Sequence, residues 1–236
     1  MFIQELSPWI GEEAERWARL LDGRAARLWR KNQVLFHQGD EARYVYVVKS
    51  GRVCVTSFQQ DGTERQLMIA ERGAMFGEEF CLARMPCLTS AVAIVDSRVY
   101  ALPFPWVEER MDRDPALCRQ IMTSVSRKNL VLLHQVMEYS SADAFQRIAQ
   151  VLVNLSRRYG QAGELGERIG IRFTQQDVAN LIHVSRVTVS NVMNALTRQG
   201  IVERRDGAFW IRKPELLAGI AQGSAPNLRR HSHASL

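Results

Sequence analysis

The 236-residue sequence has no apolar run long enough to cross a membrane. Its longest runs, such as Val45–Val48 and Val131–Leu133, are far shorter than the roughly 20 residues that a spanning helix needs. The first residues also lack a basic stretch followed by an apolar core and a cleavage site, so we expect no export signal. These absences predict a cytoplasmic protein without a membrane partner.

Cysteine is scarce and lacks metal-binding spacing. The four cysteines, Cys54, Cys81, Cys87 and Cys118, form no C-x-x-C pair and no zinc-like pattern with histidine. In a reducing compartment such thiols are free, and some are buried as small apolar side chains. Inert thiols are therefore the default expectation, and Cys81 and Cys87, which are close in the chain, are the possible exception as a thiol switch or as ligands to haem or a metal. The sequence does not identify a cofactor.

Positive charge is in excess, and it lies toward the C-terminus. Residues 1–141 hold 18 Lys and Arg and 18 Asp and Glu, whereas residues 142–236 hold 13 and 7, which accounts for the net charge of +6. Many basic surfaces bind no polyanion, but a nucleic acid would bind in this second part of the chain. The length suits two domains that each bury a core.

Residues 28–104 have the pattern of β-strands. Short β-branched or aromatic runs are separated by glycine-containing turn signals, of which Asp61-Gly62 is one. The runs are Val45–Val48, Val53–Thr56, Gln66–Ile69, Ala91–Val95 and Val99–Leu102. This pattern predicts an antiparallel roll or barrel, preceded by a helix over Gly11–Leu21. Its interior could hold a ligand pocket or a plain packed core.

From Asp114 to about Tyr139 the period of the sequence becomes helical. Two sets of residues, each spaced seven apart and interleaved with the other, form one narrow seam along the helix. The seam is apolar except for Asn129. The seam consists of Cys118, Met122, Val125, Asn129, Leu132, Val136 and Tyr139. It could pack on its own domain, but a narrow seam with a polar residue inside it is typical of paired helices. We therefore expect a homodimer through this helix.

A second domain is expected to follow this helix. Ser140–Asp143 indicates a hinge and a helix start, with Asp143 capping a helix over Ala144–Tyr159. Residues 160–168 are rich in glycine and are predicted to be a flexible connection. The polar tail from Gln222 onward is predicted to be disordered.

Two capped helices joined by a three-residue turn lie within this domain. Thr174 begins a capping box with Asp177, and Ser185 caps a second helix over Arg186–Gln199. This is the helix-turn-helix arrangement, in which the second helix enters the major groove of DNA with its N-terminal end first. The outward residues near that end are Arg186, Val187, Ser190 and Asn191. Arg can bond guanine, Asn can bond adenine, and Val can touch the methyl group of thymine.

A hairpin over Ile201–Ile211, with Asp206-Gly207 at its tip, completes a winged helix. Its arginines Arg204, Arg205 and Arg212 are expected to hold phosphates. A helical hairpin with a merely solvated face is the alternative, but the wing, the charge and the cap spacing together favour double-stranded DNA as the partner. The other predicted contact residues are Thr174, Gln175, Ser185 and Thr188.

These residues together resemble the cyclic-AMP receptor and Fnr (Crp/Fnr) superfamily of bacterial transcription regulators over almost the whole chain. In the roll the family signature is matched by Gly39-Asp40 and by residues 47–53, 61–64 and 73–78. In the second domain it is matched by residues 147–155 and 174–190. The resemblance implies a DNA-binding activator or repressor whose roll responds to a small-molecule or redox effector, with RNA polymerase as a further partner to consider.

The resemblance also implies an α+β fold with a definite order of parts. Residues 1–112 would form a sensory β-roll of the cyclic-nucleotide-binding type, and residues 113–141 a dimerisation helix and hinge. Residues 142–221 would form the C-terminal winged helix-turn-helix domain, followed by a tail over residues 222–236.

The effector region departs from the family pattern. The resemblance places the effector pocket at Gly77, Glu78, Leu88, Thr89, Ser90, Leu132 and Leu133. In members that bind cyclic AMP, an Arg before Ser or Thr neutralises the phosphate, and Leu88 stands before Thr89 here. A buried phosphate without that Arg would lose a charge-assisted hydrogen bond. Leu132-Leu133 aligns with the polar pair that meets adenine. Both departures argue against cyclic AMP.

Two other chemistries are disfavoured by the sequence. The Fnr-type iron–sulfur sensor needs cysteines near the N-terminus, and none precedes Cys54. A cupin-like metal-dependent enzyme would need clustered histidines and carboxylates, but His37, His134 and His183 are expected on a strand, a long helix and a turn. We therefore predict no catalytic residues and no metal, and we keep the cupin-like enzyme as the alternative function.

Overall fold

The computed structural model describes residues 7–12, 14–58, 64–141 and 143–224, without the side chains of residues 14, 15 and 138–141. The chain divides into two compact units, Met1–Gln135 and Val136–Leu236. The predicted Asp61-Gly62 turn and residues 225–236 of the predicted tail lie outside the described residues. The division falls within helix α4 (Pro115–Ser141). We still propose residue 142 as the domain boundary, because α4 ends just before it.

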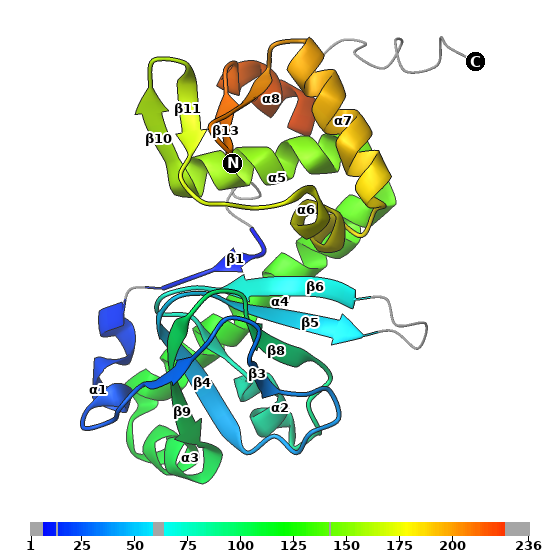
Figure 1. The fold of residues 1–236 in the computed structure, drawn as a ribbon. Coiled ribbons are helices and arrows are strands. Elements are labelled where there is room, and N and C mark those ends of the chain that lie inside the picture. The colour runs from blue at the N-terminus through cyan, green and yellow to red at the C-terminus, as the bar shows by residue number, and fades with distance from the viewer. Residues whose placement is uncertain (1–6, 13, 59–63, 142, 225–236) are drawn as a thin grey trace. The chain divides into compact units, whose positions relative to one another are not determined.

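The first unit contains a roll built from two sheets (Figure 1). One sheet has the order β1 (Trp9–Ile10), β6 (Glu64–Ala70), β5 (Val53–Phe58), β8 (Ser90–Ala93) and β3 (Val34–Phe36). The other has the order β2 (Arg27–Trp29), β9 (Ser97–Pro103), β4 (Tyr44–Ser50) and β7 (Met75–Phe76). Within the described strands of the roll, β1 and β6 pair in parallel and the remaining pairs are antiparallel. The predicted antiparallel roll is therefore confirmed.

Four of the five predicted strand runs lie wholly inside observed strands. The fifth, predicted over Ala91–Val95, ends at Ala93 because the chain turns there toward β9. The Ile94 amide still donates a hydrogen bond of 3.0 Å to the carbonyl of Arg52, in the register of the β5–β8 pair, and the pairing ends after this bond.

The predicted helix over Gly11–Leu21 begins too early. The helical part consists of a 3-10 turn, η2 (Ala14–Trp17), and a short helix, α1 (Ala18–Leu21). Before it, the Glu71 amide donates to the Ile10 carbonyl (2.8 Å), and the Glu12 amide donates to the Arg72 carbonyl (3.1 Å). The backbone groups before η2 are thus used in pairing alongside β6 and are not available to a helix.

Side chains of β4 alternate between two apolar clusters, as the period of a strand requires. Tyr46 and Val48 lie in the cluster inside the roll, where the Tyr46 ring stacks on Phe36 and Phe76 with centroid distances of 5.4 and 5.3 Å. Val45 and Val47 lie in a second cluster with the fully buried Trp17. Burying each such side chain stabilises the fold by about 1.5–3 kcal/mol.

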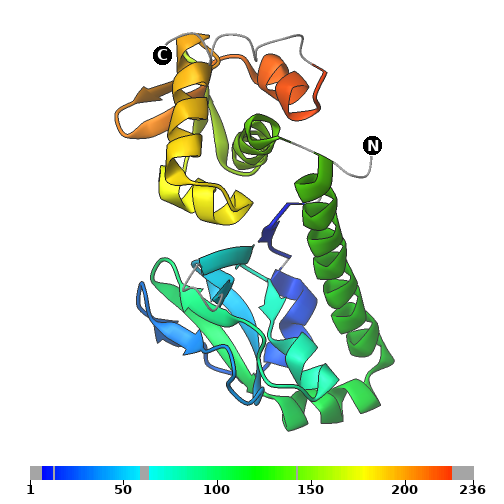
Figure 2. The ribbon, with the colours of Figure 1, turned by 90° about the vertical axis from the view of Figure 1, so that its right-hand side faces the viewer.

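Helix α4 runs along one side of the roll (Figure 2) and contributes Leu117 and Ile121 to this second cluster. It begins where the Asp114 carboxylate accepts hydrogen bonds from the amides of Ala116 (2.9 Å) and Leu117 (3.2 Å). This start agrees with the predicted start at Asp114. The buried residues of α4 follow a spacing of three and four and are Leu117, Ile121, Ser124, Lys128 and Val131. One side of the helix therefore packs on the roll.

Two shorter helices complete the first unit. Helix α2 (Glu78–Ala83) begins at Gly77, which has a φ of 83°, a conformation that glycine adopts without strain. Helix α3 (Phe104–Arg113) follows β9 and packs into the second cluster through Phe104 and Val107.

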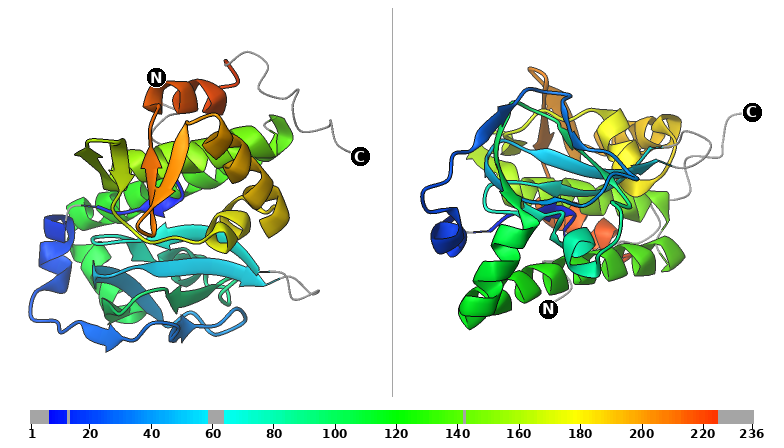
Figure 3. Two further views of the ribbon diagram at one scale, coloured as in Figure 1. Left: turned by 45° about the horizontal axis from the view of Figure 1, so that its top comes forward. Right: turned by 90° about the horizontal axis from the view of Figure 1, so that it is seen from below.

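The second unit is a winged helix-turn-helix (Figure 3). Its helices are α5 (Ala144–Tyr159), α6 (Gln175–Ile182), α7 (Arg186–Arg198) and α8 (Pro214–Ala221). Its sheet has the order β10 (Gly160–Gly163), β11 (Gly166–Ile169), β13 (Ala208–Ile211) and β12 (Val202–Arg205). The Asp143 side chain caps α5 through a bond of 2.9 Å from the Gln146 amide, which confirms the predicted cap. Fully buried side chains from helices and strands fill the core, among them Ile148, Leu152, Ile169, Leu196 and Ile201.

The predicted flexible connection over residues 160–168 is wrong. These residues form the hairpin of β10 and β11, and β11 pairs with β13 so that the wing sheet has four strands. A Cβ on Gly163 would lie 2.8 Å from the ring of Trp210, and a Cβ on Gly166 would overlap the carbonyl oxygen of Ile211. The glycines therefore permit close packing against β13.

The predicted disordered tail is wrong in its first residues. Gln222 closes α8, and the amides of Gly223 and Ser224 donate to the carbonyls of Ile220 (3.0 Å) and Gly219 (2.9 Å).

Candidate functional site

The two helices of the helix-turn-helix begin at the predicted caps. The Thr174 hydroxyl accepts a hydrogen bond of 3.1 Å from the Asp177 amide, and the Asp177 carboxylate accepts one of 2.7 Å from the Thr174 amide. The Ser185 hydroxyl accepts a bond of 3.0 Å from the Thr188 amide. The capping box and the second cap are thus confirmed. Between them, His183 has a φ of 54° and turns the chain from α6 to α7.

Helix α7 buries the side that the sequence predicted. Val189, Val192, Met193 and Leu196 are buried, while Arg186, Val187 and Asn191 are exposed. Ser190 and Thr188 are half-buried, and the Thr188 hydroxyl lies 2.8 Å from that of Ser185. Sequence analysis missed Asn194, which is also exposed and lies one turn after Ser190. The three- and four-residue spacing along the helix could have identified it.

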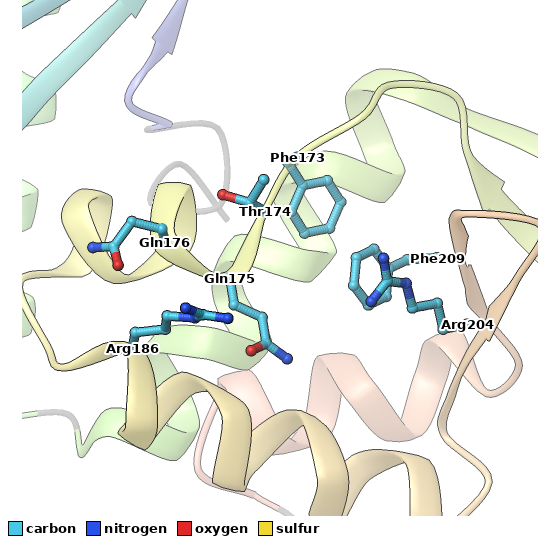
Figure 4. Close-up of a pocket in the computed structure, with 7 residues that line it drawn as sticks. All are labelled: Phe173, Thr174, Gln175, Gln176, Arg186, Arg204 and Phe209. Carbon is cyan, nitrogen blue, oxygen red and sulfur yellow. The ribbon is translucent and has the colours of Figure 1, made fainter.

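A cavity of about 390 Å³ lies between the starts of α6 and α7 and the wing (Figure 4). It brings together predicted contact residues from three separate elements: Thr174 and Gln175 at the start of α6, Arg186 at the start of α7 and Arg204 on β12. Three further lining residues were not predicted: Phe173, Gln176 and Phe209. The lining residues include two arginines and no acidic residue, so the cavity suits an anion.

Aromatic rings hold one of these arginines in place. The guanidinium carbon of Arg204 lies 5.7 Å from the ring centroid of Phe209, within the range of a cation–π contact. The Phe209 ring in turn stacks on Phe173 with a centroid distance of 4.8 Å. Because Arg204 and Phe209 are partners in the ladder of β12 and β13, the wing itself sets the position of this charge.

The other predicted phosphate contacts lie outside the cavity lining. Arg205 is exposed, and its Nε is 3.8 Å from the Asp206 carboxylate, which is itself exposed. Such a surface pair contributes little and leaves Arg205 available to a phosphate. Arg212 donates a bond of 2.8 Å to the Glu203 carboxylate. A phosphate at Arg212 would have to compete with the Glu203 carboxylate for this guanidinium.

The predicted effector residues are only partly brought together. Glu78, Thr89 and Ser90 are buried in the first unit, and the Ser90 hydroxyl accepts a bond of 2.9 Å from the Gln38 amide. Leu88 and Leu133 are exposed by 57% and 51%, and Leu132 is half-buried. The side chains of Leu88 and Leu133 therefore do not join Glu78 inside this unit.

Sequence analysis missed the main partner of Glu78, which is Lys128. The Lys128 ammonium lies 2.5 Å from Glu78 Oε1 and 2.9 Å from Glu79 Oε2. Burial raises the pKa of Glu78 to about 7, against the lowering effect of Lys128. Burial would also raise the pKa of Glu79, but Lys128 and the hydrogen bond with Glu78 hold it below its usual value. A lysine within the buried spacing of α4 was the signal that could have indicated this contact.

Both candidate redox cysteines are buried. The Cys81 thiol lies 3.5 and 3.6 Å from the carbonyls of Ala42 and Tyr44, and burial raises its pKa to about 12. Burial also raises the pKa of Cys87. Since the thiolate is the reactive form, these surroundings favour the inert thiols, which were the default expectation, over the possible thiol switch. Within the described residues, no three His, Cys, Asp or Glu side chains are placed to hold a metal ion.

None of the helices within the described ranges is both long and apolar enough to cross a membrane.

Comparisons with known proteins agree in both units. The model of the cyclic nucleotide-binding domain matches residues 26–114, and the model of the Crp-like helix-turn-helix domain matches residues 146–220. The chain is 31% identical over 199 residues to the cyclic AMP receptor protein of Thermus thermophilus, covering 84% of this chain and 89% of the relative. It is 25% identical over 198 residues to the fumarate and nitrate reduction regulatory protein of Yersinia pestis, covering 84% of this chain and 79% of that relative.

Solved structures show the same fold. FixK2 from Bradyrhizobium japonicum matches with a TM-score of 0.73 and 21% identity, over 84% of this chain and 96% of that chain. A CooA mutant from Carboxydothermus hydrogenoformans matches with a TM-score of 0.72 and 21% identity, over 88% of this chain and 90% of that chain.

We predict that Cys81 and Cys87 react slowly with iodoacetamide in the folded protein. Each should be alkylated at least about tenfold more slowly than in the urea-unfolded chain, because both burial and a raised pKa deplete the thiolate. Peptide mass spectrometry after timed alkylation at neutral pH measures this for each cysteine. Alkylation of folded Cys81 at the unfolded rate would show that it is reactive and would revive the thiol switch.

Proposed function

Because the chain belongs to the Crp/Fnr family of bacterial transcription regulators, we propose that it binds its operator as a homodimer under the control of an effector other than cyclic AMP. The matched domains and relatives are those of a DNA-binding regulator and not of an enzyme, and they do not support the cupin-like alternative. We include a cytoplasmic location in the proposal, because such a regulator acts on the DNA inside the cell.

The observation that carries the DNA-binding proposal is the cavity shared by α6, α7 and the wing. It places Arg186 and Arg204 at one surface, beside the exposed N-terminal end of α7. We assign base contacts to Arg186, Val187, Ser190 and Asn191, because these residues lie where a recognition helix meets base edges. We assign phosphate contacts to Arg204 and Arg205, because they lie on the wing.

The dimer proposal rests on a second stripe along α4. The stripe at Leu117, Ile121 and Val131 is buried on the roll, whereas the predicted seam is displaced by one residue and is largely uncovered. Within this seam, Met122 and Val136 are exposed by 62% and 63%, Asn129 is exposed, and Cys118, Val125 and Leu132 are half-buried. The side chain of Tyr139 lies outside the described residues.

A second copy would cover this seam. Leu133, next to Leu132 of the seam, extends the exposed apolar surface beside it. Removing such surface from water stabilises a complex by roughly 25 cal/mol per Å², and a two-fold axis brings the same seam from two chains together. The dimer also suits paired half-sites on DNA.

The effector region does not fit a cyclic phosphate. Glu78, Thr89 and Ser90 are buried together in the first unit, but the Lys128 ammonium is already engaged with Glu78 and Glu79. Leu88, at the position of the family's phosphate-binding Arg, is exposed and uncharged. A phosphate would therefore meet carboxylates without a cation of its own, which is unfavourable for a buried charge. This mismatch supports an effector of different chemistry.

We expect Arg186→Ala to weaken binding to the operator by about 1–3 kcal/mol and to relax the preference at one base pair. Binding to a scrambled duplex should change much less. Arg205→Ala should weaken binding to the operator and to the scrambled duplex alike. It should also reduce the slope of log K against log salt concentration by about one, because it removes one phosphate contact. The measurement is titration at several salt concentrations against an operator selected from random duplexes. Equal losses for operator and scrambled duplex in Arg186→Ala would make Arg186 a phosphate contact.

We expect Met122→Glu to dissociate the dimer, because a two-fold axis would bury two carboxylates in the seam at a cost of several kcal/mol. Thr123→Glu is the matched control, since Thr123 is the next residue of α4, is exposed and lies off the seam. Sedimentation velocity of both variants measures the association. If Met122→Glu remained a dimer with full operator affinity, the interface would lie elsewhere.

We expect isothermal titration calorimetry to show no binding of cyclic AMP at micromolar concentrations. The physical reason is the pair of carboxylates and the uncharged Leu88 in the effector region. The cyclic AMP receptor protein of Thermus thermophilus serves as the positive control under the same conditions. A micromolar dissociation constant for this chain would contradict the proposal.

A further inference from the structure

Glu78, Glu79 and Lys128 form a buried group of three charges that joins two elements of the first unit. The carboxylates belong to the first turn of α2, and the ammonium belongs to the middle of α4. The side chains of Glu78 and Lys128 are exposed by only 1% and 6%, and that of Glu79 by 29%. The contact therefore lies almost wholly out of water.

The charges of this group do not balance. If all three side chains were ionised, two carboxylates would share one ammonium, and Glu78 Oε2 has no hydrogen-bond partner in the described structure. Excess charge out of water is costly, and a pair of close carboxylates relieves that cost by holding a proton. The group is thus neutral overall when the pair holds one proton.

Other titratable groups face this site from neighbouring elements. Glu12 lies on the segment before η2, where its carboxylate is 3.1 Å from Nε of Arg16. Arg127 of α4 acts on Glu12, and the thiols of Cys81 and Cys87 interact electrostatically with Glu79. Burial raises the pKa of Glu12, so Glu12 is the group to be distinguished from Glu78.

We propose that Glu78, Glu79 and Lys128 act as a proton-dependent latch between α2 and α4. The latch is closed while the carboxylate pair holds one proton and is weakened when that proton passes to solvent. Among the buried residues of α4, Leu117, Ile121 and Val131 are apolar and Ser124 carries only a hydroxyl, so the charged group at Lys128 is the part of this contact that pH can change. The proposal depends on neither an effector nor DNA binding.

The sign of the pH effect follows from the groups themselves. The pKa of Glu78 is raised to about 7 from 4.5, so its stabilising contribution is full below pH 4.5 and is lost as pH rises through about 7. The pKa of Glu79 is lowered and that of Lys128 is raised. Both of these groups therefore stay ionised between pH 6 and 8.5. Loosening as the pH rises through neutrality is the expected direction.

The test compares thermal unfolding of the full chain with Glu78→Gln, which keeps the shape of the protonated side chain. Between pH 6 and 8.5 the Tm of the natural chain should fall by about 2–4 °C more than that of the variant. Glu12→Gln is the comparison variant: it removes the pH dependence that belongs to Glu12 and should leave the part of the fall that Glu78→Gln removes. Lys128→Met should move the fall to higher pH, because the carboxylate pair then holds its proton more tightly.

Hydrogen exchange tests whether loss of the proton loosens α4 itself, as a latch requires, or only lowers the overall stability of the chain. After correction for the intrinsic pH dependence of exchange, amides of α4 should lose protection between pH 6 and 8.5 in the natural chain but not in Glu78→Gln. The proposal is overturned if Glu78→Gln keeps the natural pH profile, or if the Tm changes while α4 protection does not. Should Lys128→Met fail to fold, the comparison with Glu78→Gln still decides.

Discussion

The packing of one side of α4 on the roll is the constraint on which the rest of the first unit depends. Leu117 and Ile121 join the cluster that contains Trp17, and Lys128 and Val131 continue the same buried side. Because an α-helix repeats every 3.6 residues, fixing this side also determines which residues remain uncovered. Met122 and Val136 of the seam are exposed for that reason, and no separate signal is needed to expose them.

Local signals in the sequence predicted the second unit well, because each of them acts within a few residues. The caps at Thr174 and Ser185 bond to amides three residues away. The wing tip at Asp206-Gly207 has φ values of 52° and 74°, which suit the residues that tolerate a left-handed backbone. Neither feature requires knowledge of the rest of the chain.

Features that depend on distant residues could not be predicted in this way. The β10–β11 hairpin was read as flexible because it is rich in glycine, yet Gly163 and Gly166 meet Trp210 and Ile211 near the other end of the domain. Likewise, Lys128 lies 49 residues from Glu79. From the sequence alone, Lys128 looks like any other charged residue of a long helix. Its burial depends on how α4 packs on the roll, which local signals do not predict.

The stacked rings of Phe173 and Phe209 have a consequence for the thermodynamics of recognition. A free arginine side chain loses much rotational freedom when it is fixed on a ligand. Arg204 already rests on Phe209, so part of that loss occurs when the domain folds rather than when DNA arrives. The rings also join the segment before α6 to the wing. A contact made by Arg204 would therefore carry a smaller entropic penalty than one made by Arg205 at the exposed tip.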